Sequence, residues 1–160
     1  MKRYSVDENT ILVITNEVIE KINIYRQTKR KYEAGGILLG KVRADYSEYI
    51  IEDISEPSLK DKRFRFGFIR NKNNAQRVIN EAFKKSNGIT HYLGEWHTHP
   101  ESNPEPSSVD RELIDKSINE TENVLDRIFM IILGFDGSLY IGSKIKGNGK
   151  MIEISEIEEK

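Results

Sequence analysis

Two histidines one residue apart, at the end of an apolar run, constrain this chain more than any other feature. His97 and His99 follow the apolar pair Tyr92-Leu93, and Pro100 comes directly after them. In a β-strand, residues i and i+2 point to the same face, so the two imidazoles can be aimed at one point. Because proline has no N–H to donate to a β-ladder, we expect the strand to end at Pro100.

A second short motif follows this strand. Ser107 and Asp110 open a helical pattern of apolar residues, and the carboxylate of Asp110 could join the two imidazoles. Two histidines and one aspartate form the ligand type expected of a catalytic zinc ion with one open position. The same residues also allow a structural interpretation, because Ser-x-x-Asp before an apolar-periodic stretch resembles a helix capping box.

The spacing of these residues resembles the JAMM motif, which marks metalloproteases of the JAB/MPN superfamily. Its pattern, His-x-His-Pro followed after six residues by Ser-x-x-Asp, is met at every position from His97 to Asp110. The motif also requires a glutamate far upstream, and Glu33 stands in the matching context, directly before an Ala-Gly-Gly that opens an apolar run. On its own, Glu33 would be interpreted as an exposed loop acid, and the resemblance is what singles it out.

The resemblance implies a zinc site with a general base beside it. The residues implied to bind Zn²⁺ are His97, His99 and Asp110. A zinc ion held there would lower the pKa of its bound water and polarise the scissile carbonyl. Glu33 would take a proton from this water and deliver one to the leaving amine. Ser107 would donate a hydrogen bond to the oxyanion that forms during the reaction.

The segment 92–100 and the compact length of the chain most resemble the small stand-alone bacterial JAB isopeptidases of anti-phage CBASS operons. This resemblance implies an enzyme that cleaves after the C-terminus of a ubiquitin-like or cGAS-like protein conjugate. Its partners would be the C-terminal tail of that conjugate and an E1/E2-like protein of the same operon. Two alternatives stay open: a peptidase that processes a sulfur-carrier protein, and a non-catalytic MPN scaffold. The complete set of motif residues favours the enzyme over the scaffold.

Length and composition narrow the class of protein. A chain of 160 residues is expected to form a single domain, residues 1–160, with a hydrophobic core large enough to be stable without cross-links. It has no cysteine, so a metal site must use histidine and carboxylate ligands. The N-terminus lacks an apolar signal core and no stretch could span a bilayer, so we expect a cytoplasmic protein without a membrane partner. A net charge of −1 argues against a dedicated nucleic-acid binder.

Hydrophobic periodicity and turn signals predict alternating strands and helices. Strands are expected at 10–15, 35–42, 49–54, 63–68, 91–99, 127–134, 139–142 and 151–154, and helices at 16–31, 73–87 and 107–122. Asn16 is the expected cap of the first helix, and the acidic tail after 154 is expected to fray. Arg and Phe alternate within 63–68, which favours a half-buried strand over a nucleic-acid platform.

This order of elements predicts an α/β (α+β) domain with a mixed, largely antiparallel sheet flanked by helices. It resembles the JAB/MPN (cytidine-deaminase-like) architecture. An extended substrate tail would reach the zinc ion through a groove, and an exposed strand edge is suited to bind it by β-addition. Which strand provides that edge is open at this stage. The loops 55–62 and 101–106 are the candidates to line the groove.

Overall fold

Strands and helices alternate along the chain in the computed structural model, which describes residues 1–28, 31–122, 124–147 and 149–159. The described strands are β1 (Lys2–Asp7), β2 (Thr10–Ile14), β3 (Gly35–Val42), β4 (Glu48–Ile54), β5 (Lys62–Phe64), β6 (Gly67–Ile69), β7 (His91–Thr98), β8 (Arg127–Leu133), β9 (Leu139–Ile145), β10 (Ile152–Glu153) and β11 (Ser155–Glu156). The described helices are α1 (Asn16–Ile24), α2 (Lys72–Lys85) and α3 (Ser108–Glu120). No helix within these ranges is long and apolar enough to span a bilayer.

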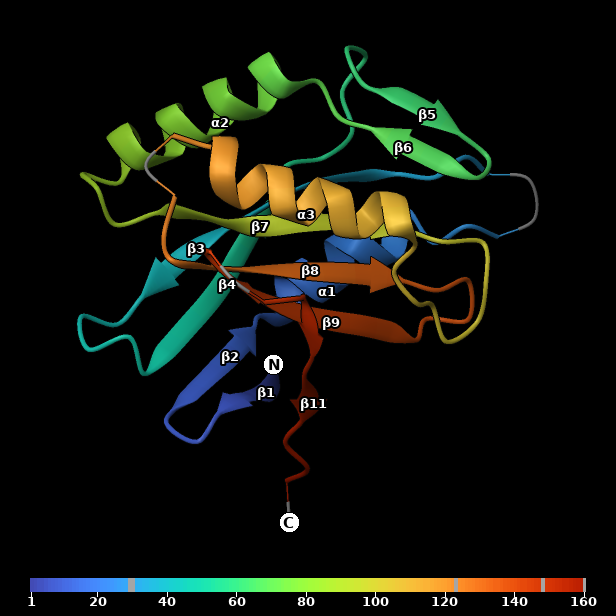
Figure 1. Ribbon diagram of the computed structural model, residues 1–160. Coiled ribbons are helices and arrows are strands. Elements are labelled where there is room, and N and C mark those ends of the chain that lie inside the picture. Colours follow the sequence, from blue (N-terminus) through green and yellow to red (C-terminus); the bar gives the residue numbers. More distant parts are fainter. Residues whose placement is uncertain (29–30, 123, 148, 160) are drawn as a thin grey trace.

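Within the described residues, nine strands form one mixed sheet in the order β10-β9-β8-β7-β3-β4-β2-β1-β11. The neighbouring pairs β2–β4 and β7–β8 are parallel, and the other pairs are antiparallel. Helices α2 and α3 lie on one face of the sheet and α1 lies on the other (Figure 1). This arrangement confirms the predicted α+β fold with a mixed, largely antiparallel sheet flanked by helices.

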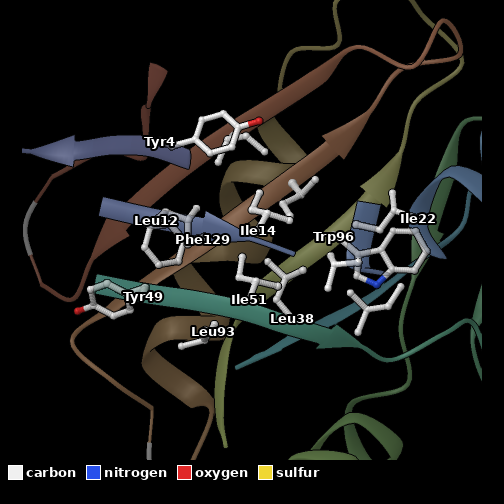
Figure 2. Close-up of a cluster of buried hydrophobic side chains, with 14 of the residues drawn as sticks. Tyr4, Leu12, Ile14, Ile22, Leu38, Tyr49, Ile51, Leu93, Trp96 and Phe129 are labelled. Carbon is white, nitrogen blue, oxygen red and sulfur yellow. The ribbon is translucent and has the colours of Figure 1, made fainter. Parts of the chain in front are cut away.

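Each face of the sheet carries its own hydrophobic cluster. Under α1, the buried side chains include Ile22, Trp96 and Phe129, which Figure 2 shows among their neighbours. On the opposite face, Ile114 and Ile118 of α3 are fully buried against β7, β8 and β9. Burying one such side chain contributes about 1.5–3 kcal/mol, so α3 is held to the sheet by its apolar face.

A β-bulge in β7 decides which of its side chains face α3. The register between β3 and β7 shifts so that Leu93 is an extra residue. The next residue, Gly94, has a φ of +134°, and a Cβ there would lie 1.8 Å from the carbonyl oxygen of Phe129. Only glycine fits this position. As a result Leu93 packs in the cluster under α1, whereas Glu95 and His97 point toward α2 and α3.

The first helix ends at Ile24, earlier than its predicted end at residue 31. Residues 26–28 are not helical, and residues 29–30 of the predicted span lie outside the described residues. The reason is a tertiary contact that hydrophobic periodicity does not reveal. Gln27 is buried and hydrogen-bonded to β7, so the chain turns inward where the basic residues indicated a helix C-terminus.

Polar side chains cap all three described helices. Thr15 caps α1, which corrects the prediction of Asn16 by one residue. Asn71 caps α2 and Ser107 caps α3, each accepting a hydrogen bond from a backbone N–H three residues further on. Such caps satisfy N–H groups that the helix itself leaves unpaired.

The prediction of one half-buried strand at 63–68 is wrong. This segment is the β5–β6 hairpin (residues 62–69), which forms a two-stranded sheet separate from the main one. Phe64 and Phe66 are 52% and 74% exposed, so the aromatic residues do not form a buried face. A two-stranded sheet is marginally stable on its own. The hairpin therefore depends on contacts with neighbouring segments.

The two ends of the described chain meet at one edge of the sheet. Strand β1 pairs with both β2 and β11, and the backbone N–H of Ile157 donates to the carbonyl oxygen of Arg3 at 2.7 Å. Lys2 and Glu156 add an exposed ion pair. The acidic segment that was expected to fray thus contains an edge strand, β11. The polar N-terminal residues before Thr10 form β1, a strand that hydrophobic periodicity did not predict.

Candidate active site

The end of β7 presents both histidines of the sequence motif on one face. His97 lies within β7, and His99 continues the ladder because its N–H donates to the carbonyl oxygen of Leu133 at 2.9 Å. The two rings are buried, with centroids 4.8 Å apart. Thr98 points to the opposite side, where its hydroxyl bonds Gln27. The predicted alternation of side chains is therefore present.

Asp110 reaches the histidines from the first turn of α3. The hydroxyl of Ser107 accepts a hydrogen bond from the N–H of Asp110 at 3.1 Å, and the Ser107 N–H donates to Asp110 Oδ2 at 2.8 Å. These reciprocal bonds are a capping box. The capping interpretation of this motif is confirmed. It is compatible with the functional one, because the cap also orients the carboxylate toward the imidazoles.

The spacing of the donor atoms fits a small metal ion. His97 Nε2 lies 3.1 Å from Asp110 Oδ1, His99 Nε2 lies 3.1 Å from Asp110 Oδ2, and the two Nε2 atoms are 3.1 Å apart. Ligands at about 2.0–2.1 Å from a tetrahedral ion would be separated by about 3.3 Å. The triad is therefore positioned to bind a metal ion. The third histidine, His91, packs edge-to-face against Phe83 and is outside this set.

The members of the triad and Glu101 shift one another's pKa values. Burial opposes ionisation of Asp110, but hydrogen bonds from His97 and His99 hold the pKa of its carboxyl well below its usual range. Burial also disfavours a charged His99, yet bonds to Asp110 and Glu101 raise its pKa overall. The Asp110 carboxyl is consequently ionised at neutral pH.

Glu101 supports His99 from the side away from the triad. Its Oε1 lies 3.0 Å from His99 Nδ1. Since Nε2 faces the triad, Nδ1 is the nitrogen that donates to this carboxylate. Histidines that bind metals usually donate their second ring N–H in this way, which fixes the orientation of the ring. The sequence analysis treated Glu101 only as part of a loop. Its position two residues after His99 could have indicated a carboxylate within reach of that ring.

Glu33 enters the same site from the segment before β3. Gly35 of β3 pairs with His97 of β7, so the residues just before β3 lie beside the motif. Glu33 is 6% exposed and lines the same cavity as the triad. Burial raises the pKa of its carboxyl to about 7, while His99 lowers it and Asp110 raises it further. A carboxyl with this pKa can exchange protons near neutral pH.

A groove of about 850 Å³ leads from the triad along α3. One wall is the β5–β6 hairpin, through residues 66–69, and the other is α3, through Val109 and Leu113. Of the two predicted loops, 101–106 contributes Glu101 and Glu105. The loop 55–62 is absent from the described lining, and the hairpin takes its place.

A buried ion pair lies on the floor of this groove. Arg70 Nε and Glu95 Oε1 are 2.5 Å apart, and the hydroxyl of Ser117 donates to the same oxygen at 2.9 Å. The side chain of Glu95 is 1% exposed and that of Arg70 is 14% exposed. The pair and Ser117 together join β7 to α3 and to the segment after the hairpin. Sequence reasoning missed this cluster because its three residues are far apart in the chain.

Comparisons with known proteins agree with this geometry. Residues 15–149 match the family described as prokaryotic homologs of the JAB domain. A protein of Escherichia coli named CD-NTase/cGAS isopeptidase is 39% identical over 148 residues, which cover 92% of this chain and 90% of that protein. A protein of Vibrio cholerae with the same name is 38% identical over 120 residues, covering 74% and 76%.

The fold also has a counterpart among solved structures. The solution structure of a protein from Desulfitobacterium hafniense superposes with a TM-score of 0.61 at 18% identity, covering 89% of this chain and 88% of that one. At this identity the likeness concerns the fold alone. Together with the family match, it confirms the predicted JAB/MPN architecture.

Proposed function

The chain belongs to the family of prokaryotic homologs of the JAB domain, and on this premise we propose that it is a zinc-dependent JAMM isopeptidase acting on conjugates of a CD-NTase or cGAS-like protein. The observation that carries this proposal is the convergence of His97, His99 and Asp110, with donor atoms 3.1 Å apart, at one end of the groove. The names of the relatives support the substrate class, and a role in anti-phage defence of the CBASS type stays a prediction.

The side chains of the site divide the reaction between them. A zinc ion bound by the triad would supply a Lewis acid and an activated water. Glu33, in its carboxylate form, accepts a proton from the attacking water as the water oxygen bonds to the scissile carbonyl carbon. Ser107 donates its hydroxyl proton in a hydrogen bond to the developing oxyanion, while its oxygen accepts from the Asp110 N–H in the cap. The C–N bond then breaks, and Glu33 returns the proton to the leaving amine.

The groove suits an extended C-terminal tail. It is bounded by the hairpin and by α3, and it ends at the triad, so a tail lying in it would bring its last residues to the metal ligands. Strand β6 belongs to a sheet of only two strands, and its edge could pair with such a tail by β-addition. Processing of a sulfur carrier would use the same chemistry, but the names of the relatives favour the CD-NTase conjugate. An E1/E2-like operon partner stays a prediction.

Metal content tests the site directly. Wild type purified with zinc should contain about one zinc ion per chain, and His97→Ala should lose it. The matched control is His91→Ala, which should retain zinc. It removes a histidine of the same strand that lies outside the triad and packs edge-to-face against Phe83. Wild type that binds no zinc after the metal is added back would contradict the metalloprotease proposal.

Cleavage of defined conjugates then tests the substrate. A protein joined through a lysine to the C-terminus of a CD-NTase should be separated from it by wild type, and a matched sulfur-carrier conjugate should be cleaved more slowly. Faster cleavage of the sulfur carrier would replace the proposed substrate with the alternative. Cleavage of neither conjugate by zinc-loaded protein would contradict both.

A further inference from the structure

Gln27 is a buried amide whose hydrogen bonds reach three separate segments. It is 3% exposed. Its Oε1 accepts from the hydroxyl of Thr98 at 2.9 Å, and its Nε2 donates to the carbonyl oxygens of Lys31 at 3.2 Å and Arg65 at 3.0 Å. One side chain thus connects the metal-ligand strand, the segment before β3 and the tip of the β5–β6 hairpin.

The bonds around Gln27 converge on the segment that carries Glu33. Thr98 Oγ1 accepts from the N–H of Ala34 at 3.0 Å, and the N–H of Thr98 donates to the carbonyl oxygen of Ala34 at 2.9 Å. The residue directly after Glu33 is therefore fixed to the residue that lies between His97 and His99. Because Thr98 holds both Gln27 and Ala34, its hydroxyl is the link between the amide and the candidate base.

The hairpin holds the backbone of Glu33 itself. The N–H of Glu33 donates to the carbonyl oxygen of Phe64 at 2.7 Å, and Arg63 Nε donates to the carbonyl oxygen of Glu33 at 3.0 Å. The position of Glu33 consequently depends on the position of the hairpin. The hairpin is in turn joined through Arg65 to Gln27.

We propose that Gln27 is a positioning residue for the reaction, which fixes Glu33 relative to the metal ligands and couples it to the hairpin wall of the groove. This inference rests on the proposed function, in which Glu33 is the general base. Reacting groups must be held near their productive geometry, and a misplacement of about 1 Å can lower a rate about 100-fold. Gln27 touches none of the reacting atoms and acts through Thr98 and Arg65.

The amide group is chemically specific at this position. It offers an acceptor to Thr98 and two N–H donors to two carbonyl oxygens, a combination that asparagine or glutamine alone can provide. Glutamate would keep the acceptor but set a carboxylate oxygen against the carbonyls of Lys31 and Arg65. Methionine would fill similar space and lose every one of these bonds. These two substitutions separate the hydrogen bonds from simple packing.

Steady-state kinetics on zinc-loaded protein provide the first test. Gln27→Met and Thr98→Val should lower kcat about 10- to 100-fold with little change in KM or zinc content. Gln27→Glu should lower kcat about as much as Gln27→Met. Thr98→Ser keeps a hydroxyl at this position, so its kcat should stay close to that of wild type. Thr90→Val, directly before the same strand and remote from the triad, is the matched control. A purely structural role predicts lower thermal stability with unchanged kcat, and that result would overturn the proposal.

Amide hydrogen exchange supplies a readout that does not require turnover. In Gln27→Met, the amides of Glu33 and Ala34 should exchange at least about 10-fold faster, while those of β8 should not change. If wild type fails to cleave any conjugate, the proposed function fails, and exchange alone decides whether Gln27 positions this segment. Unchanged exchange at Glu33 and Ala34 would overturn the proposal even in an active enzyme.

Discussion

Replacing Glu33 with glutamine should stabilise the metal-free protein, and the gain should grow with pH. The pKa of the Glu33 carboxyl is raised from 4.5 to about 7. Burial is the largest cause of this rise, and the charge of Asp110 is the next largest effect that raises the pKa. The folded state therefore binds this proton more tightly than the unfolded chain does. Stability associated with the proton is present below pH 4.5 and is lost as the pH rises through 7. Glutamine has nearly the same shape and no charge, so the variant escapes this loss.

The magnitude follows from the two pKa values. The interval between 4.5 and about 7 corresponds to about 3 kcal/mol of unfolding free energy. Glu33 is only 6% exposed, so solvent screens the effect little. For a domain of this length, 1 kcal/mol shifts Tm by about 2–4 °C. The variant should thus unfold about 6–12 °C above wild type at pH 8 and at nearly the same temperature at about pH 4.5.

Thermal unfolding of both proteins in the presence of a chelator measures the effect. Glu8→Gln, in the exposed turn between β1 and β2, is the matched control, since it removes a carboxylate without relieving burial. A Tm difference between wild type and Glu33→Gln that is the same at acidic and alkaline pH would refute the reasoning. It would mean that the folded protein does not hold Glu33 in a desolvated position.

Two further substitutions test the polar contacts of α3 and the groove. Ser107→Ala should retain zinc, lose about 1 kcal/mol of stability with its cap, and lower kcat about 100-fold; an unchanged kcat would exclude Ser107 as an oxyanion donor. Arg70→Met should destabilise the protein by about 3–5 kcal/mol in urea unfolding, because Glu95 stays buried without its partner. The double variant with Glu95→Gln should recover much of that loss. No recovery would show that the loss in Arg70→Met does not come from leaving Glu95 buried and unpaired.

The part of the site encoded within a short span could be predicted from sequence. His97 and His99 lie at the end of one strand and Asp110 lies in the first turn of the next helix, so strand periodicity and helix capping nearly determine their arrangement. Glu33 was accessible only through family resemblance, since it joins the site by pairing of β3 with β7. Gln27 was out of reach because it contacts Thr98 across 71 residues of sequence.

The errors in the predicted fold share a cause. Basic residues after Ile24 fit a helix C-terminus, but the buried amide of Gln27 draws the chain away from the helix. Alternation in 63–68 fits a strand, but Gly67 follows a turn and the segment folds back on itself. The folded-back segment is bonded to distant residues, through Arg63 to Glu33 and through Arg65 to Gln27. In both places local preference was therefore overridden by contacts with a distant part of the chain.

The alternation of side chains along β7 also has an evolutionary consequence. Glu95 and His97 face the groove, whereas Trp96 packs in the cluster under α1 and Thr98 bonds Gln27. A single codon change at His97 would remove a proposed metal ligand without disturbing the packing of Trp96. A descendant that had lost the chemistry in this way would keep the same architecture, so the fold alone is poor evidence of the chemistry.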